Sequence, residues 1–556
     1  MTQINKEVNN IGTPPKNTSF LPKFQPLNVP ETMVNHIKEL AKANEPIPHG
    51  EILNHLKEQF EKLDFVAIVF PEKVKYLQDA KEIRAKLMST DPETGALISN
   101  KKLTPKEQVE LREKANKLEE KANKLRVTTD HYLIVSIENI KKVAEKNSWG
   151  LCKNQEFVYL YNGAFWTYIE KETFQMFLGD AALKMGVDYY TGKVWHFREK
   201  LLKQFLATEY LPTPEPPKET VLINLRNGTF EINSNGNRLR QFEKADFITY
   251  QLPFDYNLKA TAPKFKAYLN KVLPDVERQR VIAEFLGFVF IKNGSNSLKE
   301  EKALILYGTG ANGKSVFFEI VNALLGIENV SSYSLQSLTE STGYYRAMIA
   351  NKLVNYASEI NGNLETSIFK QLVSGEPVEA RLPYGRPMQI RQYSKLIFNC
   401  NELPKEVEHT NAYFRRFLII PFDVTIPEHE QDKQLHTKII ESELSGVFNW
   451  VLEGLERLLS QKRFSKCDAA IKAVESYKTQ SDSVKLFIEE NSYKKSEKNF
   501  ILLKTLYMEY RTFCIEDGFK PVNKTNFSKR VQGFGIVIEK KNIGNVVFIE
   551  RTDNLF

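Results

Sequence analysis

The chain has 556 residues, of which 42% are hydrophobic and 11% aromatic, so it can build folded cores and is not an intrinsically disordered protein. Its 77 Lys and Arg residues against 69 Asp and Glu residues give a net charge of +8, which permits nucleic-acid binding without requiring it. The 4 cysteines are far apart and form no C-x-x-C pair, which argues against a disulfide framework or a zinc ribbon. No apolar run is long enough for a membrane span and the start lacks a signal-peptide core, so we expect a reducing intracellular setting and no membrane partner.

The first 129 residues divide into two predicted parts. Residues 1–30 are rich in proline and polar residues and are predicted to be a disordered tail. Residues 31–129 are predicted to be mainly helical, with a charged helix that begins at the capping box Thr104-Pro105-Lys106-Glu107. A heptad stripe follows, formed by Leu111, Ala115, Leu118, Ala122 and Leu125. It indicates either a helical hairpin or coiled coil that supports assembly, or a solvated helix packed on its own domain; the small number of heptads favours the second.

Residues 130–263 have the pattern of a mixed α+β domain. The segment 150–169 predicts two aromatic-rich strands around the turn Asn162-Gly163. The segment 221–232 predicts another strand pair around Asn227-Gly228, and 247–256 predicts one more strand. The aromatic residues of this region could stack on nucleic-acid bases, although a place in the core is the commoner role.

An apolar run, a glycine-rich turn and a helical pattern follow one another over residues 303–325. Gly308, Gly313, Lys314 and Ser315 fit the phosphate-loop pattern G-x-x-x-x-G-K-[ST], in which backbone N–H groups surround phosphates, the lysine reaches the β- and γ-phosphates, and the hydroxyl meets Mg²⁺. The pattern predicts a nucleoside triphosphate and Mg²⁺ as the bound groups. The predicted binding residues are Gly308, Thr309, Gly310, Ala311, Asn312, Gly313, Lys314, Ser315 and Val316.

Polar residues end or precede the apolar strands downstream. Glu359 lies at the end of the strand predicted over 352–360 and is the candidate catalytic base, with Ser315 and Glu359 as the candidate metal residues. Asn401 ends the strand predicted over 394–404, where an amide can sense the γ-phosphate and the attacking water. Arg415 and Arg416 precede a further strand, and in ring-shaped NTPases such an arginine reaches the nucleotide of a neighbouring subunit.

A basic segment lies between these strands. Residues 379–395 carry Arg381, Arg386, Arg391 and Lys395, and the turn around Pro383 places Tyr384 at its tip. This predicts a hairpin that contacts a nucleic-acid backbone. The alternative is a charged edge strand that only aids solubility.

The C-terminal part predicts a helical segment over 431–480 and a separate unit over 481–556. Within this unit, two helices followed by a strand hairpin favour a winged helix. Basic residues around the second helix, among them Lys524, Lys529 and Arg530, suit a phosphate backbone. A winged helix that only docks a protein is the alternative.

The succession GTGANGKS, NYASEI, FKQLVSGEPVEARLPYGR, FNCNELP and FRRFLIIPF resembles superfamily 3 helicases, specifically the C-terminal helicase type of phage and plasmid primase-helicases. The resemblance extends from about residue 130 to the C-terminus. It implies an α/β fold with a AAA+-like P-loop NTPase core over 264–430 that works as a ring, usually a hexamer, and hydrolyses ATP to translocate along DNA. It further implies Lys314 and Ser315 as phosphate and Mg²⁺ residues, Glu359 as the catalytic acid, Asn401 as the sensor, and Arg415 or Arg416 as the arginine finger. Lys370 and the segment from Arg381 to Arg391 would contact DNA.

The chain departs from this family at two points. Ser358 stands where relatives often have a second acid, so a water-mediated metal contact is expected there. Residues 1–130 offer no Cys/His cluster and no paired-aspartate site, so we expect no priming activity and a separate primase as a partner. The expected role is a replication helicase of a phage, plasmid or integrated element in the cytoplasm of a bacterial host, acting on single-stranded and forked DNA. A DNA-stimulated packaging or loading motor and a non-enzymatic nucleotide-dependent initiator remain alternatives.

Overall fold

The computed structural model describes residues 49–90, 97–100, 102–211, 219–295, 297–358, 360, 364–383, 385–404 and 409–552. The predicted tail over 1–30 lies outside these residues, and so do Glu359 and Tyr384. No helix in the described part of the chain has the length and apolar character that crossing a bilayer requires.

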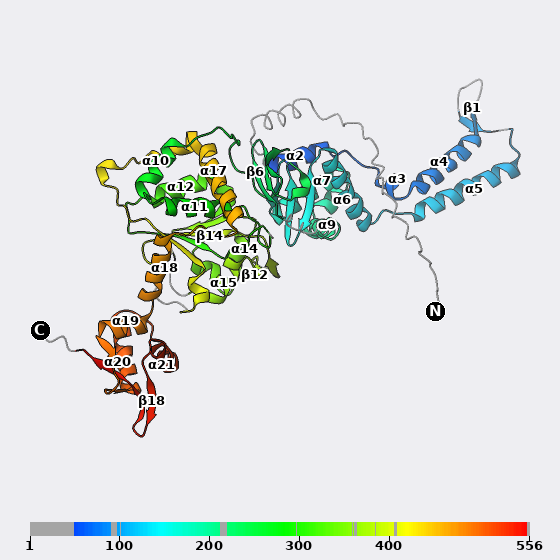
Figure 1. Ribbon diagram of the computed structural model, residues 1–556. Coiled ribbons are helices and arrows are strands. Elements are labelled where there is room, and N and C mark those ends of the chain that lie inside the picture. The colour runs from blue at the N-terminus through cyan, green and yellow to red at the C-terminus, as the bar shows by residue number, and fades with distance from the viewer. Residues whose placement is uncertain are drawn as a thin grey trace, which may run out of the picture.

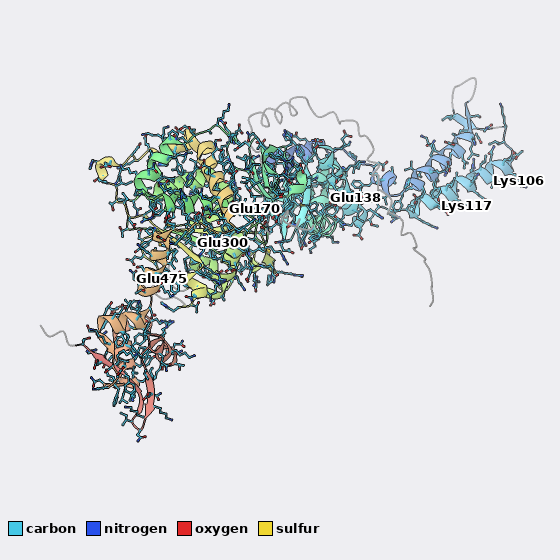
Figure 2. All side chains as sticks on the ribbon, in the orientation of Figure 1. Lys106, Lys117, Glu138, Glu170, Glu300 and Glu475 are labelled. Atoms are coloured by element: carbon cyan, nitrogen blue, oxygen red, sulfur yellow. The ribbon has the colours of Figure 1, made fainter. Side chains whose placement is uncertain are left out.

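A helical hairpin projects from the N-terminal side of the molecule (Figure 1). It consists of α4 (Pro71–Lys86) and α5 (Pro105–Lys124), with the short strands β1 (Met88–Thr90) and β2 (Leu97–Ser99) between them. The α5 helix begins at the predicted capping box, where the Glu107 N–H donates to the Thr104 hydroxyl and the Thr104 N–H donates to the Glu107 carboxylate. Figure 2 labels Lys106 near the start of α5 and Lys117 near its middle. Leu111, Ala115 and Leu118 of the heptad stripe pack against Ala80 and Ile83 of α4 within the same chain.

The next unit surrounds the three-stranded antiparallel sheet β3 (Gly150–Asn154), β4 (Phe157–Tyr161) and β5 (Trp166–Ile169). Its helices are α2 (His49–Gln59), α3 (Phe65–Val69), α6 (Thr129–Lys146), α7 (Lys171–Lys184), α8 (Tyr189–Lys193) and α9 (Trp195–Thr208). The sequence predicts two strands here and the structure has three, because Gln155 adopts a left-handed φ of 52° and makes a second tight turn without glycine.

A second three-stranded sheet, formed by β6 (Val221–Leu225), β7 (Gly228–Asn233) and β8 (Gly236–Arg240), follows the predicted turn at Asn227-Gly228. The prediction of a strand over residues 247–256 is wrong. This segment runs between the two sheets. The Trp166 N–H donates to the Ile248 carbonyl on one side, and on the other side the Leu252 N–H donates to the Asn224 carbonyl and the Arg226 N–H donates to the Phe254 carbonyl. Pro253 and the left-handed Phe247 also prevent a regular ladder.

A five-stranded, fully parallel sheet forms the centre of the molecule. Its order is β10 (Val330–Ser331), β11 (Val354–Ala357), β14 (Lys395–Cys400), β9 (Ala303–Tyr307) and β15 (Phe417–Pro421). Both faces are buried, because Leu304 and Leu306 of β9 face one core while Ala303 and Ile305 face the other. Helices therefore cover both sides (Figure 1).

The first face of the sheet is covered by α10 (Pro263–Val272), α11 (Val276–Phe288), α12 (Lys314–Leu325) and α17 (Leu435–Gln461). The other face carries α13 (Leu335–Thr339), α14 (Tyr344–Met348), α15 (Thr366–Ser374), α16 (Asn411–Phe414) and α18 (Asp468–Gln480), together with the hairpin β12 (Val378–Arg381) and β13 (Pro387–Ile390).

The buried cores do not follow the predicted boundaries at residues 130 and 263. Ile52, Leu53 and Leu56 of α2 pack into the core of the β3–β5 unit, whereas the β6–β7 strands pack into the core of the parallel sheet. The reason is that β6 and β7 are buried on the side that meets α17, where Phe230 contacts the ring of Phe448. Tertiary contacts of this kind leave no mark on local sequence pattern.

The C-terminal unit is a separate core beyond α18. Its elements are α19 (Ser483–Glu490), β16 (Tyr493–Lys495), β17 (Ile501–Leu502), α20 (Leu503–Glu516), α21 (Lys524–Gly533), β18 (Ile538–Lys541), β19 (Gly544–Val547) and β20 (Ile549–Arg551). The predicted strand hairpin is present as β18 and β19, with Lys541 opposite Gly544, and β17 completes a three-stranded sheet.

Candidate functional site

The glycine-rich turn lies between the carboxyl end of β9 and the amino end of α12. Three positions of the turn have a positive φ: Gly310 with 125°, Ala311 with 48° and Gly313 with 88°. A Cβ at Gly313 would lie 2.7 Å from Val272 Cγ1, and one at Gly308 would collide with Asn312 and with the Phe422 carbonyl. The turn therefore needs glycine at both motif positions, and α12 starts with its free N–H groups at the end of the loop.

Lys314 is buried at the base of this loop, with 7% of its surface exposed. Its ammonium donates to the Gly308 carbonyl at 2.5 Å, to Asn312 Oδ1 at 3.2 Å and to Asn401 Oδ1 at 3.4 Å. These partners are neutral oxygens, and burial lowers the pKa of Lys314. A bound anion such as phosphate would compensate the positive charge of this buried ammonium.

The strand order brings the predicted phosphate and sensor residues to one edge of the sheet. Because β14 lies between β9 and β11, the carboxyl ends of all three strands are adjacent, and they carry Gly308, Asn401 and Ser358. Asn399, on β14, accepts a hydrogen bond from the buried Tyr356 hydroxyl at 3.0 Å. Glu359 follows Ser358 in sequence, outside the described residues.

A cavity of about 660 Å³ opens over this edge, within the range of ligand sites. Predicted residues that line it are Gly310, Ala311, Asn312, Gly313, Lys314, Ser315, Val316 and Asn401. Ser315 is exposed in the first turn of α12, where its hydroxyl could hold Mg²⁺ together with phosphate oxygens and water. The residues present therefore fit a nucleoside triphosphate with Mg²⁺.

Two parts of the cavity wall are not predicted by any sequence motif. Tyr268 of α10 donates its hydroxyl hydrogen to the Gly313 carbonyl at 2.8 Å, and so supports the loop from below. Residues 430–433, which lead into α17, line the other side. Neither belongs to a motif, because both reach the loop only through the packing of α10 and α17 beside α12.

The two predicted arginines lie at the opposite edge of the sheet from the loop. The Ala303 N–H at the amino end of β9 donates to the Arg416 carbonyl at 2.8 Å, whereas Gly308 follows the carboxyl end. One strand of this length, about 16 Å, separates the two edges. Arg415 and Lys314 of one chain therefore cannot share a phosphate.

The two arginines also differ in exposure. Arg415 has 63% of its side chain exposed and reaches Glu301 at 3.2 Å. Arg416 has 9% exposed, and it bonds to Glu301 at 3.0 Å, to Ser374 Oγ at 3.0 Å and to the Ala412 carbonyl at 2.5 Å. Arg416 thus ties its loop to α15 and α16, while the Arg415 guanidinium reaches solvent.

The predicted basic hairpin is present as β12 and β13. Arg381, Arg386 and Arg391 are exposed, and the Arg381 guanidinium bonds to the Gly385 carbonyl at 2.9 Å. Arg346, which sequence reasoning missed, is 4% exposed and donates to the Glu379 carbonyl at 2.7 Å, so that it anchors β12 to α14. Lys370 is half-buried on α15.

In the C-terminal unit the three predicted basic residues have different surroundings. Lys524 and Lys529 are exposed on α21. Arg530 instead bonds to Asp482 at 3.3 Å, the residue that caps α19. Lys524 and Lys529 are therefore available to a ligand, whereas Arg530 joins two helices.

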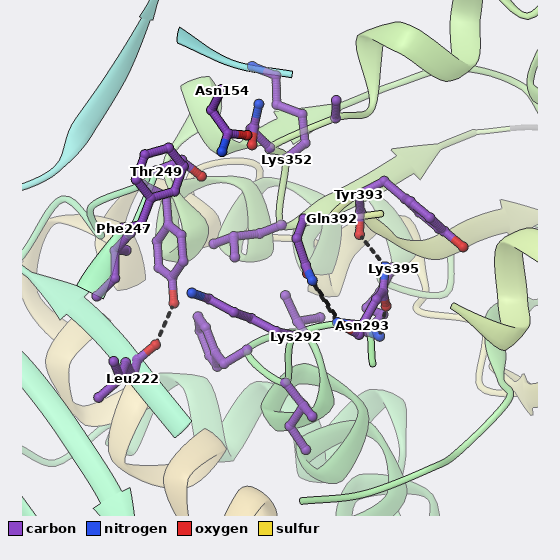
Figure 3. Close-up of a pocket in the computed structure, with 18 of the residues that line it drawn as sticks. Asn154, Leu222, Phe247, Thr249, Lys292, Asn293, Lys352, Gln392, Tyr393 and Lys395 are labelled. Atoms are coloured by element: carbon purple, nitrogen blue, oxygen red, sulfur yellow. Dashed lines mark hydrogen bonds between the residues drawn. The ribbon is translucent and has the colours of Figure 1, made fainter. Parts of the chain in front are cut away.

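A second cavity, of about 100 Å³, lies where the β3–β5 unit meets the amino edge of the parallel sheet (Figure 3). Lys292, Lys352 and Lys395 line it, and no carboxylate does so among the described residues. Lys395 begins β14, because the chain turns back between 391 and 394, so it does not belong to the basic hairpin with which the sequence groups it. Burial lowers the pKa of Lys395 to about 7.

Two family models match parts of the chain. Residues 306–416 match a family of unknown function (DUF5906), and residues 152–274 match a family described as D5 N terminal like. "Putative helicase L207/L206" of Acanthamoeba polyphaga mimivirus is 27% identical over 249 residues, which are 42% of this chain and 25% of that protein. "Putative helicase 121R" of Invertebrate iridescent virus 3 is 22% identical over 339 residues, which are 53% of this chain and 35% of that protein.

The chain thus aligns with about a third or less of the length of these viral proteins. Among solved structures, the A form apo structure of the NrS-1 C terminal region has a TM-score of 0.41 and 15% identity, covering 73% of this chain and 97% of that one. The chain is therefore similar to viral proteins named as helicases, and the matched segment 306–416 runs from the phosphate loop to the two arginines.

Proposed function

We propose that this chain is an ATP-dependent DNA helicase with a AAA+-like core, acting as a ring of identical subunits in the replication of a phage, virus, plasmid or integrated element. The similarity to proteins named as helicases supports the reaction class. The observation that carries the ring is the position of Arg415, one strand length from the phosphate loop of its own chain.

The nucleotide half of the proposed site consists of the phosphate loop, Lys314 and Asn401. Lys314 would hold the β- and γ-phosphates, and Ser315 would hold Mg²⁺, which would neutralise the charge that develops on the leaving ADP. Glu359 accepts a proton from the attacking water as the bond between the γ-phosphorus and the bridging oxygen breaks, yielding ADP and phosphate. Asn401, already in contact with Lys314, orients that water.

The second half of the site comes from a neighbouring subunit. An exposed arginine at the amino edge of one sheet can reach the phosphate loop at the carboxyl edge of the next when subunits follow one another in a ring. Arg415 fits this role because it is exposed, and Arg416 does not because its bonds to α15 and α16 hold it inside its own chain. We therefore assign the arginine finger to Arg415.

The bound nucleotide acts on DNA through the segment between β11 and β14, the two strands that end beside the phosphate loop. The chain leaves β11 after Ser358, forms α15 and the β12–β13 hairpin, and returns on β14 to Asn401. Movement at either strand end would therefore shift the exposed Arg381, Arg386 and Arg391. In a ring these side chains would grip the backbone of one strand and pull it.

The test is one assay of DNA-stimulated ATP hydrolysis and unwinding on 3′- and 5′-tailed forks. Lys314→Ala should abolish both, whereas Lys106→Ala, on the projecting hairpin, should change neither. Hydrolysis without strand separation would favour a packaging or loading motor. Negligible hydrolysis in the presence of DNA would favour a non-enzymatic initiator, and unwinding by Lys314→Ala at the wild-type rate would exclude the proposed mechanism.

A further inference from the structure

Three large aromatic side chains are exposed within seven residues of the β3–β5 unit. Tyr189 is 63% exposed, Tyr190 79% and Trp195 71%. They lie on the short helix α8 and on the first residue of α9. We call Tyr189, Tyr190 and Trp195 the aromatic surface.

The core of the unit does not need these rings. The buried face of α9 already carries Phe197 and Phe205, which are 2% and 1% exposed, and Phe205 packs edge-on against Phe174. The Trp195 ring contacts the His196 ring, and the Tyr189 ring contacts the Tyr190 ring. The ring contacts of the exposed aromatic residues are therefore with residues next to them in sequence. Adjacent exposed aromatic residues are uncommon on a folded surface without a ligand.

Positive charge accompanies these rings. Lys193 holds its ammonium 5.9 Å from the centre of the Tyr189 ring. Lys184, Lys193 and Lys200 are exposed and form no ion pair with any residue in the described ranges. The neighbouring Arg198 and Lys203 are neutralised by Asp180 and Glu199.

We propose that the aromatic surface binds single-stranded nucleic acid, with bases stacked on Tyr189, Tyr190 and Trp195 and phosphates close to Lys193 and Lys200. Stacking needs flat exposed rings and tolerates any base, while flanking lysines attract the backbone, and this chain places both kinds of group in one short segment. The charge favours nucleic acid over an apolar protein partner. The inference rests on the proposed helicase function for its biological purpose, since it gives the moving strand a second contact outside the hairpin, but binding itself requires no hydrolysis.

The experiment uses the full chain carrying Lys314→Ala, so that nucleotide turnover does not enter. Oligothymidylate is titrated while tryptophan emission is recorded. Trp149 and Trp166 are 6% and 2% exposed and Trp450 is half-buried on α17, whereas Trp195 is 71% exposed, so Trp195 should supply most of the quenching. Trp195→Phe should keep the affinity within about twofold, measured by anisotropy of a labelled oligonucleotide, while most of the quenching disappears.

Removing the rings should weaken binding. Trp195→Ala and Tyr190→Ala should each lower the affinity about tenfold, whereas the matched control Tyr210→Ala, 60% exposed on the same unit, should leave it unchanged. Circular dichroism melting checks that each variant is folded. Wild-type affinity in both ring variants, or quenching that persists in Trp195→Phe, would overturn the proposal.

A change of oligomer size in Trp195→Ala with unchanged oligonucleotide affinity would also overturn it, and would assign the surface to contact between subunits. The two proposals remain distinguishable. If the wild-type chain fails to unwind forks but its Trp195 emission is quenched, the helicase function fails alone. If it unwinds forks and the ring variants bind normally, the aromatic surface fails alone.

Discussion

The Lys314 ammonium lies 3.4 Å from Asn401 Oδ1, across 87 residues of sequence. This contact joins the phosphate loop after β9 to the end of β14, and it exists because β14 is inserted beside β9 in the sheet. A side chain that touches the phosphate-binding lysine is well placed to respond to bound nucleotide.

Asn401→Ala should lower kcat for ATP hydrolysis about a hundredfold while changing nucleotide affinity much less, because an oriented amide acts mainly on the attacking water. The measurement is steady-state hydrolysis together with binding of a fluorescent ATP analogue. Asn491→Ala, in the C-terminal unit, is the control. Equal losses in affinity and kcat would instead indicate that Asn401 only supports the loop.

Arg415→Ala should abolish hydrolysis with little change in melting temperature, because its side chain is 63% exposed. Arg416→Ala should cost about 1–3 kcal/mol of folding stability, because it removes bonds to Ser374 and Ala412 in a buried region. Mixing Arg415→Ala with Lys314→Ala should restore part of the activity, since some interfaces would then combine an intact loop with an intact arginine. Hydrolysis that does not depend on the mixing ratio would rule out a shared site.

Tyr268→Phe should weaken nucleotide binding, because the Gly313 carbonyl loses the hydroxyl that bonds to it at 2.8 Å. The expected loss of stability is about 1 kcal/mol, measured by denaturant unfolding without nucleotide. Tyr507→Phe, which removes a similar bond to the Val522 carbonyl in the C-terminal unit, is the matched control and should leave nucleotide binding unchanged. Unaltered nucleotide binding in Tyr268→Phe would show that the loop needs no support from α10.

Lys524→Ala and Lys529→Ala should each weaken duplex DNA binding and reduce the slope of log affinity against log salt by about 1, as expected for single phosphate contacts. Arg530→Ala should mainly lower stability, because its guanidinium pairs with Asp482. Filter binding at several salt concentrations and thermal melting separate the two effects. An unchanged salt slope in both lysine variants would favour a protein-docking role for this unit.

Stability between pH 7 and 9 should depend on Lys395. Its pKa in the folded chain is about 7, below the 10.5 of the unfolded chain, so the unfolded state binds more protons in this window and stability rises with pH. Lys395→Met should therefore show a smaller rise in melting temperature from pH 7 to pH 9. Lys494→Met, an exposed lysine in the C-terminal unit, should follow the wild type. A rise in Lys395→Met as large as that of the wild type would contradict the lowered pKa.

The sequence alone determined the local elements and the chemistry of the loop. The capping box at Thr104, the turns at Gly163 and Gly228, and the strand–loop–helix around Lys314 follow from neighbouring residues whose backbone preferences agree with the fold. Where preferences were weak, the prediction was wrong. Gln155 turned without glycine, and the segment 247–256 stayed extended without forming a strand.

Only the tertiary structure decided which residues meet. The insertion of β14 between β9 and β11 put Asn401 on Lys314, and packing of α10 put Tyr268 under Gly313. Arg415 is exposed and Arg416 is buried, and Lys529 is exposed whereas Arg530 pairs with Asp482, although the two residues of each pair look alike in sequence. In the same way Trp195 lies at the surface and Phe197 is buried. Sequence pattern specifies how each segment folds, but contacts between distant segments depend on strand order and helix packing, which local preferences do not encode.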